Sequence, residues 1–209
     1  MIFYYLNSFS KRVIDILGSI FCLILFSPIF IIISILIKNS SEGPIFFKQE
    51  RIGKFGKKFI LLKFRTMYIN NDNLIHENFV SKFINGEKIQ DNIYKIQNDH
   101  RIFPIGRILR KFSLDEIPQF INILKGEMSI VGPRPPLYYE FKQYEKWHKE
   151  RLNVNPGITG LWQIYGRSKT SFNEMVQMDL KYIKNWNIFL DIRIILQTPL
   201  VIFSCRGAF

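Results

Sequence analysis

The sequence predicts an α+β fold with an N-terminal re-entrant membrane helix, a small β-hairpin, and several amphipathic or interfacial helices around a polar site. Three observations support this fold class: an uncharged apolar segment near the N-terminus, an alternating apolar and polar stretch after it, and basic amphipathic stretches in the rest of the chain. At 209 residues the chain is long enough for one domain with a real core. We expect residues 1–40 to anchor the protein in a membrane and residues 41–209 to form a single cytoplasmic unit.

The chain is strongly basic, which limits the class of partner. It has 29 Lys and Arg against 17 Asp and Glu, a net charge of +12, so we expect anionic partners such as nucleic acid, an acidic membrane surface or phosphorylated small molecules. No nucleic-acid recognition motif occurs in the sequence, and the 20 phenylalanines lie mainly within apolar runs. Two cysteines supply no disulfide framework and three scattered histidines predict no zinc site, so we expect any metal to be bound by oxygen.

Residues 16–37 form an uncharged apolar segment, about 33 Å long as a straight helix, which is enough to cross the hydrocarbon core of a bilayer. A transmembrane helix is therefore the first interpretation. Pro28 lies within the segment, where it lacks a backbone N–H and should kink the helix. The hydroxyl of Ser27 is placed to satisfy the carbonyl that is freed. We expect the helix to break at Ser27 and Pro28.

Basic residues flank both ends of this segment, whereas a spanning helix normally has such an excess on one side only. They are Lys11 and Arg12 before it, and Lys38, Lys48, Arg51 and Lys54 after it. A helix that enters the membrane, bends and leaves by the same face would place both flanks on the cytoplasmic side, so we favour the re-entrant form. A cleaved signal peptide is the other alternative, but the apolar part is too long and lacks a small-residue cleavage site.

Residues 44–67 (PIFFKQERIGKFGKKFILLKFRTM) change to an alternating, β-rich pattern. Gly53 and Gly56 frame a basic turn between two strand-like runs, which predicts a β-hairpin. The turn lacks the spacing of a phosphate-binding G-x-x-x-x-G-K-[ST] loop. Lys63 and Arg65 alternate with apolar residues, so they should share one face of the second strand, where they either line an anion site or meet solvent.

Two segments follow the hairpin. Residues 68–98 are polar and irregular, which predicts a short helix and a mobile loop over the site. Residues 106–112 (GRILRKF) are basic and amphipathic, so their cations, Arg110 among them, should lie at phosphate headgroups or at a substrate.

The C-terminal third contains three further candidate elements. Residues 138–152 read as one amphipathic helix with many charges, typical of a solvated or interfacial face. Residues 161–165 (LWQIY), next to a turn at residues 155–157, read as a short apolar strand. Residues 186–205 carry charges and end in an apolar part too short to span a bilayer, so we expect this stretch to lie on the membrane or to close the core.

Residues 113–136 (SLDEIPQFINILKGEMSIVGPRPP) place two adjacent carboxylates close in sequence to an arginine held between prolines. Asp115 is a candidate nucleophile or metal ligand, Glu116 is a candidate acid or base, and Arg134 offers a planar fork of donors that matches phosphate oxygens. Ser113 and Glu116 also have the spacing of a capping box, followed by apolar residues at helical spacing. Both interpretations are compatible, because a helix N-terminus would keep Asp115 ionised.

A membrane anchor on one side, many cations, a carboxylate pair and a proline-held arginine together favour a reaction between phosphates at a membrane surface. A lipid phosphate that attacked a nucleotide diphosphate directly would bring two anions together. A divalent cation and arginines lower that repulsion, and a carboxylate that first accepts the phosphoryl group splits the reaction into two steps. The alternatives are a nucleic-acid-binding protein, suggested by the positive charge, and a membrane scaffold whose carboxylates only cap a helix.

Ordered blocks along nearly the whole chain resemble those of the monotopic phosphoglycosyl transferases, also called bacterial sugar transferases. Besides Ser27-Pro28, the blocks are KFRTM (63–67), LR (109–110), SLDEIPQ (113–119), GEMS (126–129), VGPRP (131–135) and PGITGLWQ (156–163). The resemblance is to the catalytic unit alone. Residues 98–101 read NDHR where the family commonly has Asn-Asp-Pro-Arg, and the chain ends RGAF where tyrosine is more usual.

The resemblance implies transfer of a sugar-1-phosphate from a UDP-sugar to undecaprenyl phosphate or another polyprenyl phosphate, with release of UMP and a requirement for Mg²⁺. It implies that Asp115 forms a phosphosugar-aspartyl intermediate, that Glu116 assists, and that Arg134 belongs to the phosphate site. Further substrate-site residues carried over from the family are Lys63, Arg65, Arg110 and Gln163. The implied location is the cytoplasmic face of a bacterial inner membrane, where the reaction would initiate assembly of a membrane-linked glycan.

Overall fold

The computed structural model describes residues 2–69, 74–86, 99–166 and 170–204, and within them the architecture is α+β as the sequence predicts. The helices of six or more residues are α1 (Ile2–Leu25), α2 (Ser27–Ser40), α3 (Leu74–Ile84), α4 (Pro104–Lys111), α5 (Gln119–Leu124), α9 (Phe172–Lys184) and α10 (Ile188–Phe203). The strands are β1 (Phe46–Ile52), β2 (Lys58–Phe64), β3 (Ser129–Val131) and β4 (Gly157–Thr159). The strands form two small sheets, β1–β2 and β3–β4.

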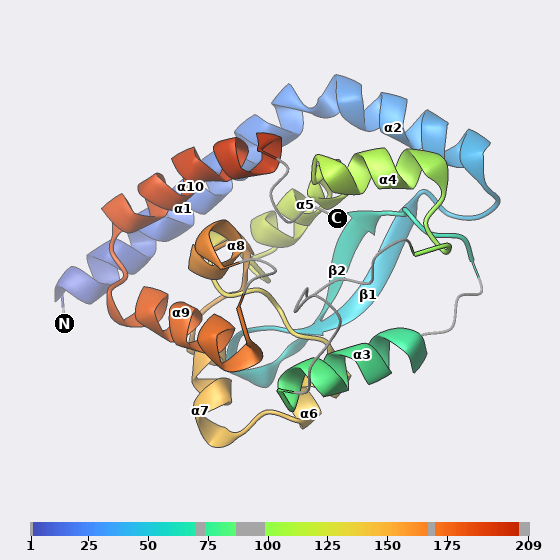
Figure 1. Cartoon of the computed structure of the whole chain (residues 1–209). Coiled ribbons are helices and arrows are strands. Elements are labelled where there is room, and N and C mark those ends of the chain that lie inside the picture. The colour runs from blue at the N-terminus through green and yellow to red at the C-terminus, as the bar shows by residue number, and fades with distance from the viewer. Residues whose placement is uncertain (1, 70–73, 87–98, 167–169, 205–209) are drawn as a thin grey trace.

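Figure 1 shows how these elements are arranged. Helices α1 and α10 lie side by side along one edge of the molecule, and α2 continues from α1 after a bend and runs beside α4. The β1–β2 hairpin crosses the middle, and α3, α6 (Tyr138–Lys142) and α7 (Lys146–Lys149) lie on the side away from α1, α2 and α10.

The N-terminal apolar segment is broken where the sequence predicts. Helix α1 ends at Leu25, α2 begins at Ser27 with Pro28 in its first turn, and the two axes are bent by 61°. Pro28 has no N–H to offer the carbonyl of Ile24, and the hydroxyl of Ser27 donates to that oxygen instead at 2.8 Å. Among the described helices none is by itself long and apolar enough to cross a bilayer, whereas the bent pair from Phe9 to Ser40 together has the length and composition.

The predicted hairpin is confirmed. Strands β1 and β2 are antiparallel with Phe46 opposite Phe64 and Ile52 opposite Lys58, and a tight turn at Lys54–Gly56 joins them. Gly56 adopts φ 77°, a conformation that a residue with a β carbon rarely takes, which explains a glycine at this point of the turn.

The second sheet joins two glycine-containing blocks that are distant in the sequence. Strands β3 and β4 are parallel, and Gly132 donates its N–H to the Thr159 carbonyl at 2.9 Å. A β carbon added at Gly157 would lie 2.1 Å from the backbone nitrogen of Gly132, so the two backbones approach each other only because no side chain intervenes. This contact sets the position of the loop that carries Arg134.

Two predictions of secondary structure are wrong. Residues 161–165 form helix α8 (Leu161–Tyr165) rather than a strand, because a short apolar run has no period that separates the two, and Trp162 packs in a core cluster with α9. Residues 138–152 are not one helix: α6 ends at Lys142, and the N–H of Glu145 donates to His148 Nδ1 where α7 starts.

Other expected elements are present. Helix α3 is the predicted short helix, and α4 is the predicted basic helix before the carboxylates. The mobile loop expected over the site falls largely on residues 70–73 and 87–98, which lie outside the described residues.

The cations that precede the apolar segment are bonded inside the protein. Lys11 Nζ donates to Asp191 Oδ2 at 2.6 Å, to the Val131 carbonyl and to the Tyr182 hydroxyl. Arg12 donates to the carbonyls of Ile123 and Leu124 at the C-terminal end of α5, where a cation also interacts favourably with the helix dipole. These two residues therefore hold α1 onto the rest of the protein. Their charged groups are bonded internally, so they do not act as the basic flank of a membrane segment.

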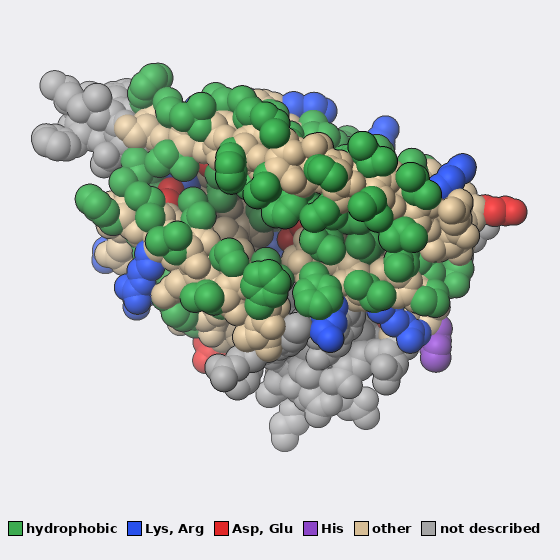
Figure 2. Space-filling view, turned by 90° about the horizontal axis from the view of Figure 1, so that it is seen from above, with side chains coloured by type: hydrophobic (Ala, Val, Ile, Leu, Met, Phe, Trp, Pro, Cys, Tyr) green, Lys and Arg blue, Asp and Glu red, His purple; other side chains and the backbone are tan. Residues whose placement is uncertain are grey.

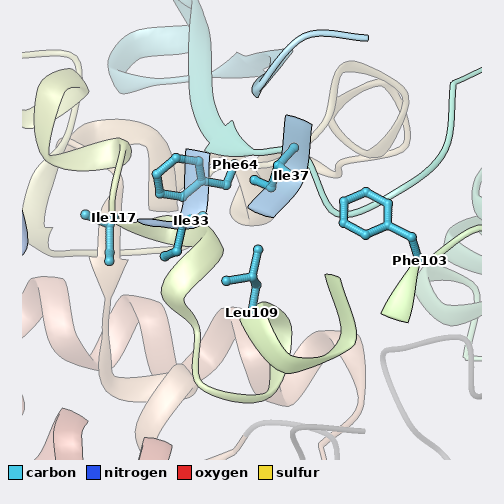
Figure 3. Close-up of a cluster of buried hydrophobic side chains, with 6 residues drawn as sticks. All are labelled: Ile33, Ile37, Phe64, Phe103, Leu109 and Ile117. Atoms are coloured by element: carbon cyan, nitrogen blue, oxygen red, sulfur yellow. The ribbon is translucent and has the colours of Figure 1, made fainter. Parts of the chain in front are cut away.

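Helix α2 is partly a core helix. Its two buried residues pack with β2, α4 and the segment after the carboxylates, in the cluster of Figure 3: Ile33, Ile37, Phe64, Phe103, Leu109 and Ile117. The other face of the helix stays exposed, with Ile31 62% and Ile32 56% accessible. Figure 2 shows the apolar surface that such side chains form on the face seen from above.

We expect Lys11→Met to lower the free energy of unfolding by about 3 kcal/mol, because the Asp191 carboxylate, 4% exposed, loses its cation while remaining buried. Denaturant unfolding in detergent measures the change. Lys38→Met is the control: Lys38 is exposed in the last turn of α2, so its replacement should change stability by less than about 0.5 kcal/mol. Equal losses from both variants would contradict an internal role for Lys11.

Candidate active site

The carboxylate pair lies in a single tight turn between α4 and α5. Leu114–Glu116 form a 3₁₀ turn, and Ser113 before it adopts the left-handed conformation with φ 54°. The capping-box interpretation is wrong, because the Ser113 side chain makes no cap hydrogen bond and α5 begins only after Pro118. A left-handed conformation costs a non-glycine residue energy, so the surrounding structure holds the turn in this shape.

Strand β2 supplies the cation that faces the pair. Lys63 Nζ lies 2.6 Å from Glu116 Oε1 and 3.9 Å from Asp115 Oδ2. Asp115 is only 7% exposed, whereas the Glu116 side chain is 30% exposed. The Lys63 ammonium therefore offsets negative charge at both carboxylates, of which Asp115 is the more buried.

Helix α4 brings a second cation. Arg110 Nε donates to the Thr66 hydroxyl at 3.0 Å, which holds the guanidinium beside the turn. Burial lowers the pKa of Arg110, and the negative charges of Asp115, Asp99 and Glu116 oppose that shift. Arginine remains protonated under such conditions, so Arg110 is a fixed positive charge at the site.

Asp99 and Arg101 complete this side of the site, and residue-by-residue reasoning on the sequence did not single them out. Arg101 donates to Asp99 from Nε at 2.8 Å and from Nη2 at 2.7 Å, and its backbone N–H donates to the same carboxylate at 3.0 Å. The charged hydrogen bonds hold the pKa of Asp99 below its usual range. The sequence block at residues 98–101 could have indicated this pair, because Asp99 precedes Arg101 by two residues. The ion pair forms although His100 stands where the family commonly has proline.

Arg134 and Gln163 also line the cavity: Arg134 lies on the loop after β3, and Gln163 lies in helix α8, which follows β4. The Arg134 carbonyl accepts from Arg151 Nη2, and Arg151 is also paired with Asp179 of α9. The side chains of Arg151 and Asp179 are 1% and 2% exposed, so the loop with Arg134 rests on a buried ion pair.

Arg65 also lines the site, but its guanidinium is engaged elsewhere. It donates to the Ser41 hydroxyl and to the carbonyls of Ser41, Glu42 and Pro44, and the residue is only 4% exposed. Arg65 thereby fastens the connection from α2 to β1. The structure does not bring its charged group into the cluster around Lys63.

One cavity of about 2030 Å³ joins all of these residues. Its polar wall includes Lys63, Asp99, Arg101, Arg110, Asp115, Glu116, Arg134 and Gln163, and its apolar wall comes from many elements, α1, α10 and the β1–β2 hairpin among them. The volume is about twice that of a large small-molecule pocket. The cavity therefore has room for more than one substrate.

The donor set suits a hard metal ion bound together with a substrate. Within the described part of the chain, no three or more His, Cys, Asp or Glu side chains lie together in a group that could hold a metal ion. Asp115 and Glu116 offer carboxylate oxygens only, and Mg²⁺ commonly uses one or two carboxylates with substrate phosphates. The residues present thus fit Mg²⁺ if phosphate oxygens complete the coordination.

Paired carboxylates, fixed cations and an apolar wall in one cavity fit a transferase that acts on phosphorylated substrates. The chain matches the bacterial sugar transferase family model over residues 6–205, and it belongs to that family.

Named relatives extend along almost the whole chain. The exopolysaccharide production protein ExoY of Rhizobium meliloti is 40% identical over 98% of this chain and 90% of its own length. The undecaprenyl-phosphate galactose phosphotransferase of Salmonella typhimurium is 38% identical over 97% of this chain and 42% of its own length. The UDP-glucose:undecaprenyl-phosphate glucose-1-phosphate transferase of Klebsiella pneumoniae is 38% identical over 98% of this chain and 42% of its own length. These similarities identify the protein as a phosphoglycosyl transferase.

We expect Asp99→Asn to destabilise the protein at neutral pH and not in strong acid. The folded-state pKa of Asp99 is depressed by Arg101, so its stabilising contribution is present above the unfolded-state pKa and is lost as the pH falls through the folded-state value. Thermal unfolding of both proteins should show a constant difference from pH 7 to about pH 5 that shrinks below about pH 4. A difference that grows with acidification would contradict this assignment.

Proposed function

We propose that the protein transfers a sugar-1-phosphate from a UDP-sugar to undecaprenyl phosphate, releasing UMP, through a covalent intermediate on Asp115. The observation that carries this proposal is the nearly buried Asp115 carboxylate, which lies in a cavity with Lys63, Arg110 and Arg134. Relatives whose names specify undecaprenyl phosphate as acceptor support the choice of substrates.

In the first step an Asp115 oxygen attacks the phosphorus that bears the sugar. The bond from that phosphorus to the bridging oxygen of the diphosphate breaks, and UMP leaves with the bridging oxygen. Lys63, Arg110 and Arg134 line the same cavity as Asp115, so they would stabilise the charge that develops and orient the phosphates. Glu116 is ion-paired with Lys63 and keeps that ammonium aimed at Asp115.

In the second step an oxygen of the lipid phosphate attacks the same phosphorus, and the bond to Asp115 breaks. The product is a lipid-linked diphosphate sugar, and the carboxylate is regenerated. Splitting the transfer in this way means that the two anionic substrates need not react directly. Mg²⁺ bound through Asp115 and substrate phosphates would neutralise part of the charge during transfer.

The proposed location is the cytoplasmic face of the bacterial inner membrane. The bent α1–α2 pair supports a re-entrant anchor, and its exposed apolar residues need a nonpolar environment. An anionic membrane surface would attract the net charge of +12. This protein would then initiate a membrane-linked glycan such as an exopolysaccharide, capsule or O-antigen.

Asp115→Asn should reduce UMP release by at least about 10³-fold, because the neutral amide is a poor nucleophile of nearly the same shape. Unaltered protein mixed with donor alone should gain the mass of one sugar phosphate at Asp115, and the variant should not. Glu50→Gln is the matched control, since Glu50 is a carboxylate on the hairpin surface paired with Lys58. A fully active Asp115→Asn protein would remove the mechanism.

The re-entrant arrangement predicts that both ends of the α1–α2 pair face the cytoplasm. Ser8→Cys and Ser40→Cys, placed separately in a protein whose Cys22 and Cys205 are serine, should each react with a membrane-impermeant maleimide in inverted vesicles and not in spheroplasts. Labelling of the two positions from opposite sides would mean that the pair spans the bilayer.

A further inference from the structure

One part of the wall of the active-site cavity comes from α1 and α10, which lie side by side, and the transfer of phosphate does not explain it. We call this part of the cavity the α1–α10 groove. Its walls are Ile14, Leu17, Gly18, Phe21 and Cys22 from α1, and Ile195, Thr198, Pro199, Val201 and Ile202 from α10. On each helix these positions recur at about one turn, so each helix presents one face to the groove.

Fixed contacts hold the two helices of the groove in place. Lys11 and Asp191 form an ion pair between the N-terminal parts of α1 and α10, and every groove residue follows that pair in its own helix. Further along α10, the Thr198 hydroxyl lies 2.8 Å from the Thr159 hydroxyl of β4. The ion pair thus joins the two helices before the groove begins, and Thr198 attaches the groove to β4, which precedes Gln163.

The outer surfaces of the same helices are also apolar and exposed. Along α10 the exposed residues recur at helical spacing: Phe189, Ile192, Leu196, Leu200 and Phe203. Leu17 and Phe21 of α1 are 61% and 64% exposed at the edge of the groove. Figure 2 shows hydrophobic side chains over this face and a hollow near its centre with acidic atoms at the bottom. A ligand in the groove would therefore enter from an apolar surface.

Charged side chains line the same cavity. Lys63, Arg110 and Arg134 line it together with Asp115. A single cavity that is lined both by cations and by the apolar α1–α10 groove matches a molecule with an anionic phosphate head and a long hydrocarbon chain.

We propose that the α1–α10 groove binds the isoprenoid chain of the lipid phosphate acceptor and so directs its phosphate toward Asp115. This assignment rests on the proposed function, in which a polyprenyl phosphate is the second substrate. Half-buried Ile195, Val201 and Ile202 contact the hydrocarbon chain, while the catalytic carboxylate contacts only the head. Residues of the groove therefore determine affinity for the acceptor and leave the reaction with the donor unaffected.

The first test fills the groove. Ile202→Trp should raise the KM for undecaprenyl phosphate by at least about tenfold, whereas adduct formation from UDP-sugar alone should be unchanged. Leu200→Trp, the same change on the outer face of α10 and outside the cavity, should leave both values near those of the unaltered protein. An unchanged acceptor KM in Ile202→Trp, or an equal rise in Leu200→Trp, overturns the assignment.

Loss of adduct formation in the unaltered protein would instead refute the proposed function, so the two failures are distinguishable.

If Ile202→Trp does not fold, a second measurement on the protein with an unaltered groove tests the proposal. Cys22 lines the groove and is half-buried, so its alkylation by N-ethylmaleimide in a Cys205→Ser protein reports occupancy. In phosphatidylcholine nanodiscs, undecaprenyl phosphate should slow this alkylation at least about fivefold and phosphatidic acid should not. Equal protection by both lipids, or none by either, overturns the proposal.

Discussion

The fold depends on compensating the negative charge of two adjacent carboxylates in the cavity. The surrounding elements bring a cation close to both of them. Asp115 is 7% exposed, and Lys63 lies within 4 Å of it and of Glu116. Lys63 reaches the pair only because β2 is held in the hairpin, against which α2 packs through Phe64. The apolar contact of α2 with the hairpin and the ionic contact at the site are therefore parts of one arrangement.

Helix α1 combines charged bonds to the protein interior with an exposed apolar surface. Its N-terminal half uses Lys11, Arg12 and Asp15 to bond the interior, and its C-terminal half exposes apolar side chains at the edge of the cavity. An anchor held by charged hydrogen bonds does not slide relative to the carboxylates, so the distance from the apolar surface to Asp115 is set by the fold. A transferase that joins a soluble donor to a lipid acceptor needs such a fixed distance.

Local sequence signals were informative wherever a single residue type dictates the backbone. Pro28 and Ser27 indicated the helix break, and the glycines of the hairpin turn indicated the strand reversal. The same reasoning did not find the strained turn at Ser113, since serine followed by glutamate has the spacing of an ordinary cap. The residue pattern left Arg65 between an anion site and solvent; in the fold its guanidinium donates to nearby carbonyls, although the residue also lines the cavity.

The amino-acid sequence by itself determined the family, the break in the apolar segment and the types of group available for chemistry, because each depends on short blocks of adjacent residues. Only the tertiary structure decided which charges meet. Lys11 meets Asp191 and Lys63 meets Glu116 across 180 and 53 residues of chain, and Asp99 and Arg101 join the same cavity from a separate loop. Electrostatic partners are selected by distance in space, and that distance depends on how all of the elements pack.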